Sequence, residues 1–166
     1  LKKALDEQNG SLPLPMIKNT KTIDPRDKSS DAVFQLETAM GAAIECFENA
    51  GAICVPRSRF APVKTTSDLF ALRSDAYEQT PDGRIALVAS RDGYPPVIDL
   101  SDEYKMVDSL EGLGMPSLLK AKKLKVSGPV RFTDGVTIVG EVSFINETGD
   151  TKWVAGGTYT DEEVTL

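Results

Sequence analysis

The 166-residue chain contains no histidine. Histidine is the usual general base of enzymes and the commonest metal ligand, so no Ser-His-Asp or Cys-His arrangement can be built from this chain. The Gly-x-Gly-x-x-Gly and P-loop patterns that hold nucleotide phosphates are also absent. Any chemistry that the chain carries therefore depends on other residue types.

Cysteines and long apolar runs are scarce as well. Cys46 and Cys54 are the two cysteines, and their spacing matches no common metal site. Because two cysteines are too few to stabilise this length with disulfides, we expect a reducing, cytoplasmic location. No apolar run approaches the roughly 20 residues that cross a bilayer and no signal peptide is recognisable, so we expect no membrane partner.

Charge is unevenly distributed along the chain. Residues 1–75 carry ten basic and ten acidic side chains, whereas residues 76–166 carry nine and fifteen, which places the whole net charge of −6 there. An acidic chain without a broad basic face binds nucleic acids poorly, so we expect no nucleic-acid partner. Any phosphate binding should be local.

Hydrophobic spacing predicts mixed α and β structure before residue 80. We expect the end of a helix over residues 1–8 and a short strand over residues 14–18. A longer helix is expected to begin at Ser30 and end at Gly51, because apolar residues recur there at helical spacing. A buried strand is expected over Ile53–Val55.

The segment after this strand is the most informative part of the chain. It runs from Pro56 to Asp68 and holds three cations, with no acidic residue between Glu48 and Asp68. The cations are Arg57, Arg59 and Lys64.

The cationic segment ends where a helix is predicted to begin. Thr65 and Asp68 have the spacing of a capping box, which predicts a helix over residues 66–77. A helix N-terminus presents unpaired backbone N–H groups and a partial positive charge, and Lys64 adds a full charge beside it. The segment is therefore a candidate site for a phosphate or diphosphate. The alternative is an exposed loop with ordinary surface cations.

The last third of the chain contains an internal repeat in which Leu124–Phe132 aligns with Val136–Phe144 at an offset of twelve residues. Five alternate positions match: Leu124 with Val136, Val126 with Ile138, Gly128 with Gly140, Val130 with Val142 and Phe132 with Phe144. Alternate matches predict strand–Gly–strand units with one buried face. Twelve is two hexapeptides, so a stacked β-helix is the favoured interpretation, with two ordinary strands of a sandwich as the alternative. Trp153 is expected to lie in the core or to pack under the last turn.

Several segments resemble one enzyme family. Gln35–Ile44 and Val55–Leu69 closely resemble segments of eukaryotic UDP-glucose pyrophosphorylase, also called UTP–glucose-1-phosphate uridylyltransferase, and Ile17–Thr22 and Val126–Phe132 are similar to it as well. The resemblance covers nearly the whole chain and corresponds to the C-terminal portion of the family. It implies the α/β end of a Rossmann-like nucleotidyltransferase domain over residues 1–90 and a short left-handed parallel β-helix over residues 91–166.

The resemblance also implies a reaction. The family converts UTP and glucose 1-phosphate into UDP-glucose and pyrophosphate with Mg²⁺. The lysine of its Val-Lys-Thr-Thr-Ser-Asp motif contacts the substrate phosphates and is needed for activity, and that position here is Lys64. Arg57 and Arg59 are further candidates for substrate binding, or they hold the loop through backbone carbonyls.

Other parts of the family's active site are not found in this sequence. Its glycine-rich nucleotide loop, its metal-binding aspartate and its sugar site are expected upstream of Leu1, so we expect the chain to act within a longer protein, called the parent enzyme below, and to be inactive alone. The choice of glucose rests on resemblance, because the N-acetylhexosamine pyrophosphorylases share the architecture. The alternative function is a non-catalytic β-helix module for interaction or oligomerisation, and a homo-oligomer through this region is one expectation.

Overall fold

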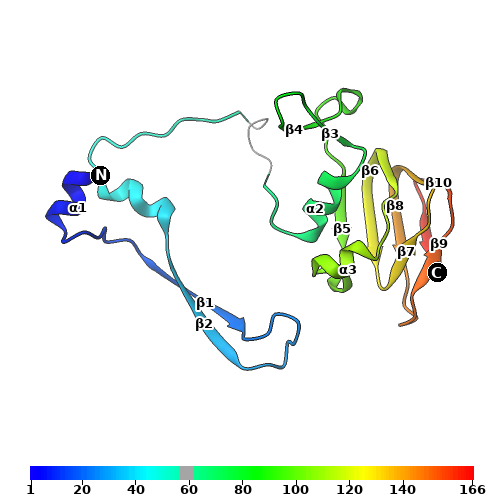
Figure 1. Cartoon of the computed structure of the whole chain (residues 1–166), viewed down its shortest axis with the longest axis horizontal. Coiled ribbons are helices and arrows are strands. Elements are labelled where there is room, and N and C mark those ends of the chain that lie inside the picture. The colour runs from blue at the N-terminus through cyan, green and yellow to red at the C-terminus, as the bar shows by residue number, and fades with distance from the viewer. Residues whose placement is uncertain (57–61) are drawn as a thin grey trace. The chain divides into compact units, whose positions relative to one another are not determined.

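The computed structural model describes residues 1–56 and 62–166 (Figure 1). Its contacts divide the chain into two compact units, an N-terminal unit (Leu1–Arg59) and a C-terminal unit (Phe60–Leu166), which we describe separately. In the described ranges, no helix is long and apolar enough to cross a membrane.

The N-terminal unit is built around a hairpin. Its elements are α1 (Lys2–Glu7), β1 (Met16–Thr22), β2 (Ala32–Thr38) and the 3₁₀ helix η1 (Met40–Cys46). β1 and β2 pair antiparallel, with Met16 opposite Thr38 and Thr22 opposite Ala32. The predicted helix at the start of the chain is confirmed. The strand predicted over residues 14–18 is also present, but it runs from Met16 to Thr22.

Two further predictions for this unit were wrong. The helix expected from Ser30 to Gly51 is replaced by strand β2 followed by η1. Val33, Leu36 and Met40 do fall at helical spacing, but residues 32–38 also alternate along a strand, and pairing with β1 satisfies their backbone groups. The buried strand expected over Ile53–Val55 is absent, and Ile53 is 91% exposed.

The C-terminal unit is dominated by parallel strands. It begins with α2 (Thr66–Arg73), the hairpin β3 (Tyr77–Gln79) and β4 (Ile85–Leu87), and the 3₁₀ helix η3 (Ala89–Arg91). It continues with β5 (Val97–Leu100), η4 (Asp102–Tyr104), α3 (Val107–Glu111), β6 (Ser117–Ser127), β7 (Val130–Phe132), β8 (Val136–Ile145), β9 (Lys152–Val154), β10 (Gly157–Thr160) and β11 (Glu163–Thr165). The main sheet has the order β10-β8-β6-β5, with β11 also on β8, and all its pairs are parallel. β7 and β9 form a second parallel pair.

The sequence repeat correctly predicts which residues face the core, but it does not predict which residues of neighbouring strands lie side by side. Every apolar residue at the five matched positions of the repeat is at most 5% exposed. The residues that lie side by side, however, are Leu124 with Val142 and Val126 with Phe144, eighteen positions apart. Periodicity reports which side chains point inward, whereas the number of residues in each turn of chain decides which strands become neighbours.

The repeated glycines lie at close approaches between neighbouring turns of chain. Gly128 and Gly140 have positive φ angles of 79° and 69°. A Cβ atom at Gly128 would collide with the carbonyl oxygen of Asn146, and one at Gly140 would collide with the Asp161 carboxylate. At Gly128 the obstacle is backbone, so only glycine fits both the angle and the contact, whereas at Gly140 the obstacle is the end of a side chain and the positive φ is the firmer constraint.

One core holds the C-terminal unit together. Phe132, Phe144 and Tyr159 stack edge to face, with ring centroids 5.2 and 5.1 Å apart. Phe70 of α2 is 1% exposed and belongs to the same core, which ties this helix to the sheet. The prediction that Trp153 lies in the core or packs under the last turn was wrong: the residue lies on β9 and is 61% exposed.

Candidate functional site

The N-terminus of α2 carries the predicted capping box. Thr65 is the N-cap, and its hydroxyl accepts the backbone N–H of Asp68 at 3.3 Å. The Asp68 carboxylate in turn accepts the backbone N–H of Thr65 at 2.8 Å. The reciprocal bonds satisfy two of the orphan donors at the helix start, so the prediction of the helix and its cap is confirmed. The helix ends at Arg73, earlier than the predicted residue 77.

Lys64 is fixed through its backbone to the same carboxylate. Its N–H donates to Oδ2 of Asp68 at 3.0 Å, and the residue is exposed. The hydrogen bond from the Lys64 N–H, with further bonds from Thr65, holds the pKa of Asp68 below its ordinary value of 3.8. At neutral pH the carboxylate is therefore ionised and serves as acceptor. An exposed lysine beside a capped helix N-terminus can neutralise a phosphate that meets the helix start.

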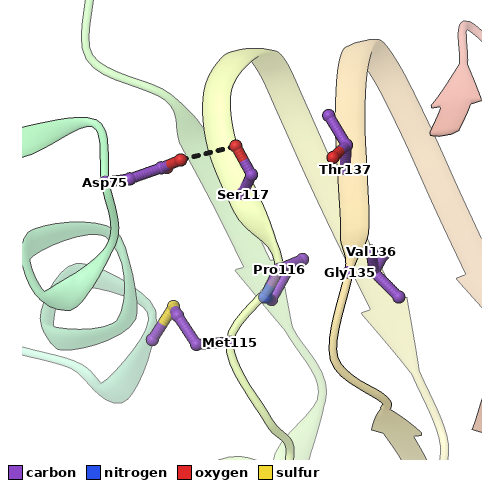
Figure 2. A pocket seen from close by; sticks show the side chains of 7 residues that line it. All are labelled: Asp75, Met115, Pro116, Ser117, Gly135, Val136 and Thr137. Carbon is purple, nitrogen blue, oxygen red and sulfur yellow. Dashed lines mark hydrogen bonds between the residues drawn. The ribbon is translucent and has the colours of Figure 1, made fainter. Parts of the chain in front are cut away.

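Helix α2 is anchored to the sheet at several points, and it lies beside β5 (Figure 1). Ser67 accepts the backbone N–H of Leu100 in β5 at 3.3 Å. Just past the helix, Asp75 accepts the hydroxyl of Ser117 in β6 (Figure 2). It also accepts the backbone N–H of Leu118, the next residue of β6, at 2.7 Å. Together with the buried ring of Phe70, these contacts hold both ends of the helix.

A shallow hollow lies beside the Asp75–Ser117 bond, at the start of β6 and β8 (Figure 2). It encloses about 280 Å³ and is lined by Asp75, Met115, Pro116, Ser117, Gly135, Val136 and Thr137. Its one charged lining residue is the carboxylate of Asp75, and no lysine or arginine lines it to offset the repulsion of a phosphate, as Lys64 does beside Asp68. The hollow is therefore no candidate for the phosphate site predicted at Lys64.

The structure describes one of the three predicted site residues. Lys64 lies at the start of α2, whereas Arg57 and Arg59 lie outside the described residues. Sequence reasoning did not select Ser67, Phe70 or Asp75 as residues that anchor α2 and the chain after it to the rest of the C-terminal unit. Their partners lie in distant parts of the chain, 33 residues away for Ser67 and 42 for Asp75, so no local pattern could have revealed them.

Comparison with known proteins identifies the family to which this chain belongs. Residues 1–139 match the family described as UTP--glucose-1-phosphate uridylyltransferase. The UTP--glucose-1-phosphate uridylyltransferase of Solanum tuberosum is 41% identical over 129 residues, which are 76% of this chain and 27% of that protein. The protein of the same name from Encephalitozoon cuniculi is 34% identical over 168 residues, covering 99% of this chain and 32% of that protein.

Solved structures agree with the sequence matches. The UDP-glucose phosphorylase structure from Trypanosoma brucei has a TM-score of 0.90 and 47% identity, covering 99% of this chain and 36% of that chain. A mutant UDP-glucose pyrophosphorylase from Leishmania major in complex with UDP-glucose has a TM-score of 0.85 and 44% identity, again over 99% of this chain and 36% of that one. The parallel sheet and its helices fit the nucleotidyltransferase-like α/β fold of these proteins. The chain belongs to the UTP–glucose-1-phosphate uridylyltransferase family, and it spans about a third of the length of these relatives.

Proposed function

We propose that the chain supplies the Lys64 segment of a UTP–glucose-1-phosphate uridylyltransferase. The parent enzyme converts UTP and glucose 1-phosphate into UDP-glucose and pyrophosphate. The observation that carries the proposal is the family match, which runs through Lys64 and the capped helix behind it. The Leishmania major structure with UDP-glucose supports the choice of product.

In this reaction a phosphate oxygen of glucose 1-phosphate attacks the α-phosphorus of UTP. A new P–O bond forms there, the bond to the bridging oxygen of the β-phosphate breaks, and pyrophosphate leaves. Such a transfer needs two anions held in line and their developing charge neutralised. The Lys64 ammonium, a compact charge on a flexible stem, binds phosphate oxygens in this role. Arg57 and Arg59 are the candidates for additional phosphate contacts, with a role in holding the loop as the alternative.

The family's Mg²⁺ does not fit the described part of this chain. In residues 1–56 and 62–166, no three His, Cys, Asp or Glu side chains are grouped to hold a metal. The Asp68 carboxylate is already occupied by three hydrogen bonds. We propose that the ligands belong to the rest of the parent enzyme, and we expect that EDTA abolishes UDP-glucose formation and that added Mg²⁺ restores it.

The proposal also includes the division of the chain into two domains. Residues 1–90 complete the nucleotidyltransferase domain, and residues 91–166 form a left-handed parallel β-helix. The all-parallel pairing and the eighteen-residue stacking of β6 on β8 support a β-helix, since eighteen residues are three hexapeptides. An experimental structure of the parent enzyme would decide the handedness and the domain boundary.

The first test is the rate of UDP-glucose formation by the parent enzyme, wild type against Lys64→Ala. We expect a loss of at least about 100-fold in turnover, which is about 2.7 kcal/mol of transition-state stabilisation. An unchanged rate in a folded variant would remove Lys64 from the reacting phosphates. The 166-residue chain alone should give no turnover, and a clear rate from it would contradict the proposed division of the active site.

A second candidate function is a non-catalytic interaction or oligomerisation module. The observation that favours it is Trp153, whose large ring is 61% exposed and lies 5.6 Å from the Arg131 guanidinium. Exposed tryptophan and arginine side chains are enriched at interfaces. If the chain self-associates through this surface, sedimentation should show an oligomer that Trp153→Ala dissociates. A wild-type monomer would argue against this function.

We place the parent enzyme in the cytoplasm, on the support of Cys46 and Cys54, which are both free thiols in the structure. Fractionation of cells that express it tests this location.

A further inference from the structure

One oxygen of Asp68 gathers more hydrogen bonds than a capping box requires. A capping box needs a bond between the third helical residue and the N-cap N–H. Oδ2 of Asp68 accepts that bond from Thr65, and it also accepts the Thr65 hydroxyl at 2.8 Å and the backbone N–H of Lys64 at 3.0 Å. The extra bond reaches past the cap to residue 64, where it does nothing for the helical hydrogen-bond pattern.

None of the three donors is the lysine side chain. All are backbone or hydroxyl groups, and the Lys64 ammonium adds an electrostatic attraction that also lowers the pKa of Asp68. The carboxylate therefore orders the main chain under the lysine while its side chain remains exposed. Asp68 itself stands on a helix whose Phe70 is 1% exposed and whose Ser67 is bonded to β5.

We propose that Asp68 is a positioning residue for Lys64. Its carboxylate fixes the backbone of residue 64 to a helix that is anchored in the core, so that the ammonium reaches the phosphates from a defined starting point. A lysine has four rotatable side-chain bonds. A fixed backbone therefore limits the positions that its ammonium can reach. The inference rests on the proposed function, in which Lys64 binds the reacting phosphates.

The test uses steady-state kinetics of the parent enzyme with UTP and glucose 1-phosphate, together with thermal unfolding. Asp68→Ala should lower kcat by about tenfold or more, because the lysine is no longer held in the productive geometry. Asp68→Asn, which keeps the shape but weakens the acceptor, should fall between wild type and Asp68→Ala. Asp68→Glu should recover kcat to within about threefold, since glutamate is the usual partner in this position of the box.

Asp75→Ala is the matched control. It removes the same kind of carboxylate from the other end of α2, where the partners are Ser117 and the Leu118 backbone rather than Lys64. We expect a lowered Tm with kcat within about threefold of wild type, because such a loss of hydrogen bonds affects stability and not the lysine. If Asp75→Ala lowers kcat as much as Asp68→Ala does, Asp68 acts only through stability and the proposal is wrong.

A double-mutant cycle separates this proposal from the one it rests on. If Asp68 acts through the lysine, Lys64→Ala combined with Asp68→Ala should lose no more kcat than Lys64→Ala alone, whereas independent effects would multiply. A large loss for Lys64→Ala with wild-type kcat for Asp68→Ala and Asp68→Asn overturns the positioning role and leaves the proposed function standing. Wild-type kcat for Lys64→Ala overturns both. Should Asp68→Ala fail to fold, the same cycle is run with Asp68→Asn.

Discussion

Gly128 and Gly135 have nearly the same backbone angle and different surroundings. Their φ values are 79° and 80°. A Cβ atom at Gly128 would collide with the carbonyl oxygen of Asn146, whereas one at Gly135 would meet nothing within 4 Å. The pair therefore separates the cost of a strained φ from the cost of forcing two turns of chain apart.

We expect Gly135→Ala to lower the free energy of unfolding by about 1 to 2 kcal/mol, the cost of an alanine in the left-handed region. Gly128→Ala should carry that cost and a further 1 to 3 kcal/mol, roughly, because a backbone carbonyl must move to make room. Urea denaturation of the 166-residue chain measures both. Equal losses would mean that the turns separate freely at Gly128.

Residues of the candidate site were predictable from the sequence only where their partners are near. Thr65 and Asp68 are three positions apart, and a helix start imposes that spacing, so the cap could be recognised in advance. The bond from Lys64 to Asp68 depends on the fold of the loop, and the bond from Ser117 to Asp75 depends on the placement of a strand 42 residues away. Neither leaves a signal in a single sequence.

At the scale of elements, β6 has irregular pairing with β8, and Arg91 donates hydrogen bonds to carbonyl groups in the irregular stretch. Its register against β8 shifts between Ser117 and Lys120 and again between Ala121 and Lys123. Bulges of this kind leave backbone groups without ladder partners. β5 pairs with β6 only from Lys123 onward, so it covers none of the irregular stretch.

The guanidinium of Arg91 donates hydrogen bonds to carbonyl groups of β6 in the stretch that β5 does not cover. Its Nη1 donates to the carbonyl oxygens of Leu118 and Leu119 at 2.8 and 2.9 Å, and its Nη2 donates to that of Ala121 at 2.7 Å. Its Nε donates to the carbonyl oxygen of Tyr94 at 2.8 Å, which ties the loop before β5 to the same point. A planar fork of donors suits several acceptors at once.

Replacing this arginine should therefore be costly even when the charge is kept. We expect Arg91→Lys to lower the free energy of unfolding by about 2 kcal/mol, since an ammonium cannot reach all four carbonyls, and Arg91→Ala by about 3 kcal/mol or more. Urea denaturation measures the loss. Arg84→Ala is the control, because Arg84 is an exposed side chain whose ion pair with Asp82 spans a turn, and such pairs contribute little. If Arg91→Lys lowers the free energy of unfolding no more than Arg84→Ala does, water can replace Arg91 as the hydrogen-bond donor to the carbonyl groups of the bulge.

Elements were predictable where local rules and tertiary pairing agree. The helix at Thr66–Arg73 has a cap, an apolar residue that enters the core and a clear start, and it was predicted. The segment 32–38 fits both a helical stripe and an alternating strand, and only its pairing with β1 selects the strand. The neighbours of each parallel strand in the C-terminal unit were ambiguous as well. A pattern of buried residues does not reveal how many residues separate strands that lie side by side.

At the scale of the whole chain, the two units differ in how much they bury. Every large, fully buried side chain lies in the C-terminal unit, and none of residues 1–56 is fully buried. On one face of the β1–β2 hairpin, Met16, Phe34 and Leu36 are 67%, 61% and 60% exposed. A two-stranded hairpin without a packed face is marginally stable in water.

Hydrogen exchange of the 166-residue chain should reveal this contrast. Backbone amides of β6 and β8, which have parallel neighbours and a buried face, should exchange only through global unfolding, at a rate set by the full stability of the unit. Amides of residues 16–38 should exchange with protection lower by about 100-fold or more, because opening the hairpin exposes little apolar surface that was not already in water. If the proposed nucleotidyltransferase domain covers the Met16, Phe34 and Leu36 face in the parent enzyme, the same amides should become protected there. Strong protection of the hairpin in the isolated chain would mean that these side chains find a partner within the 166 residues.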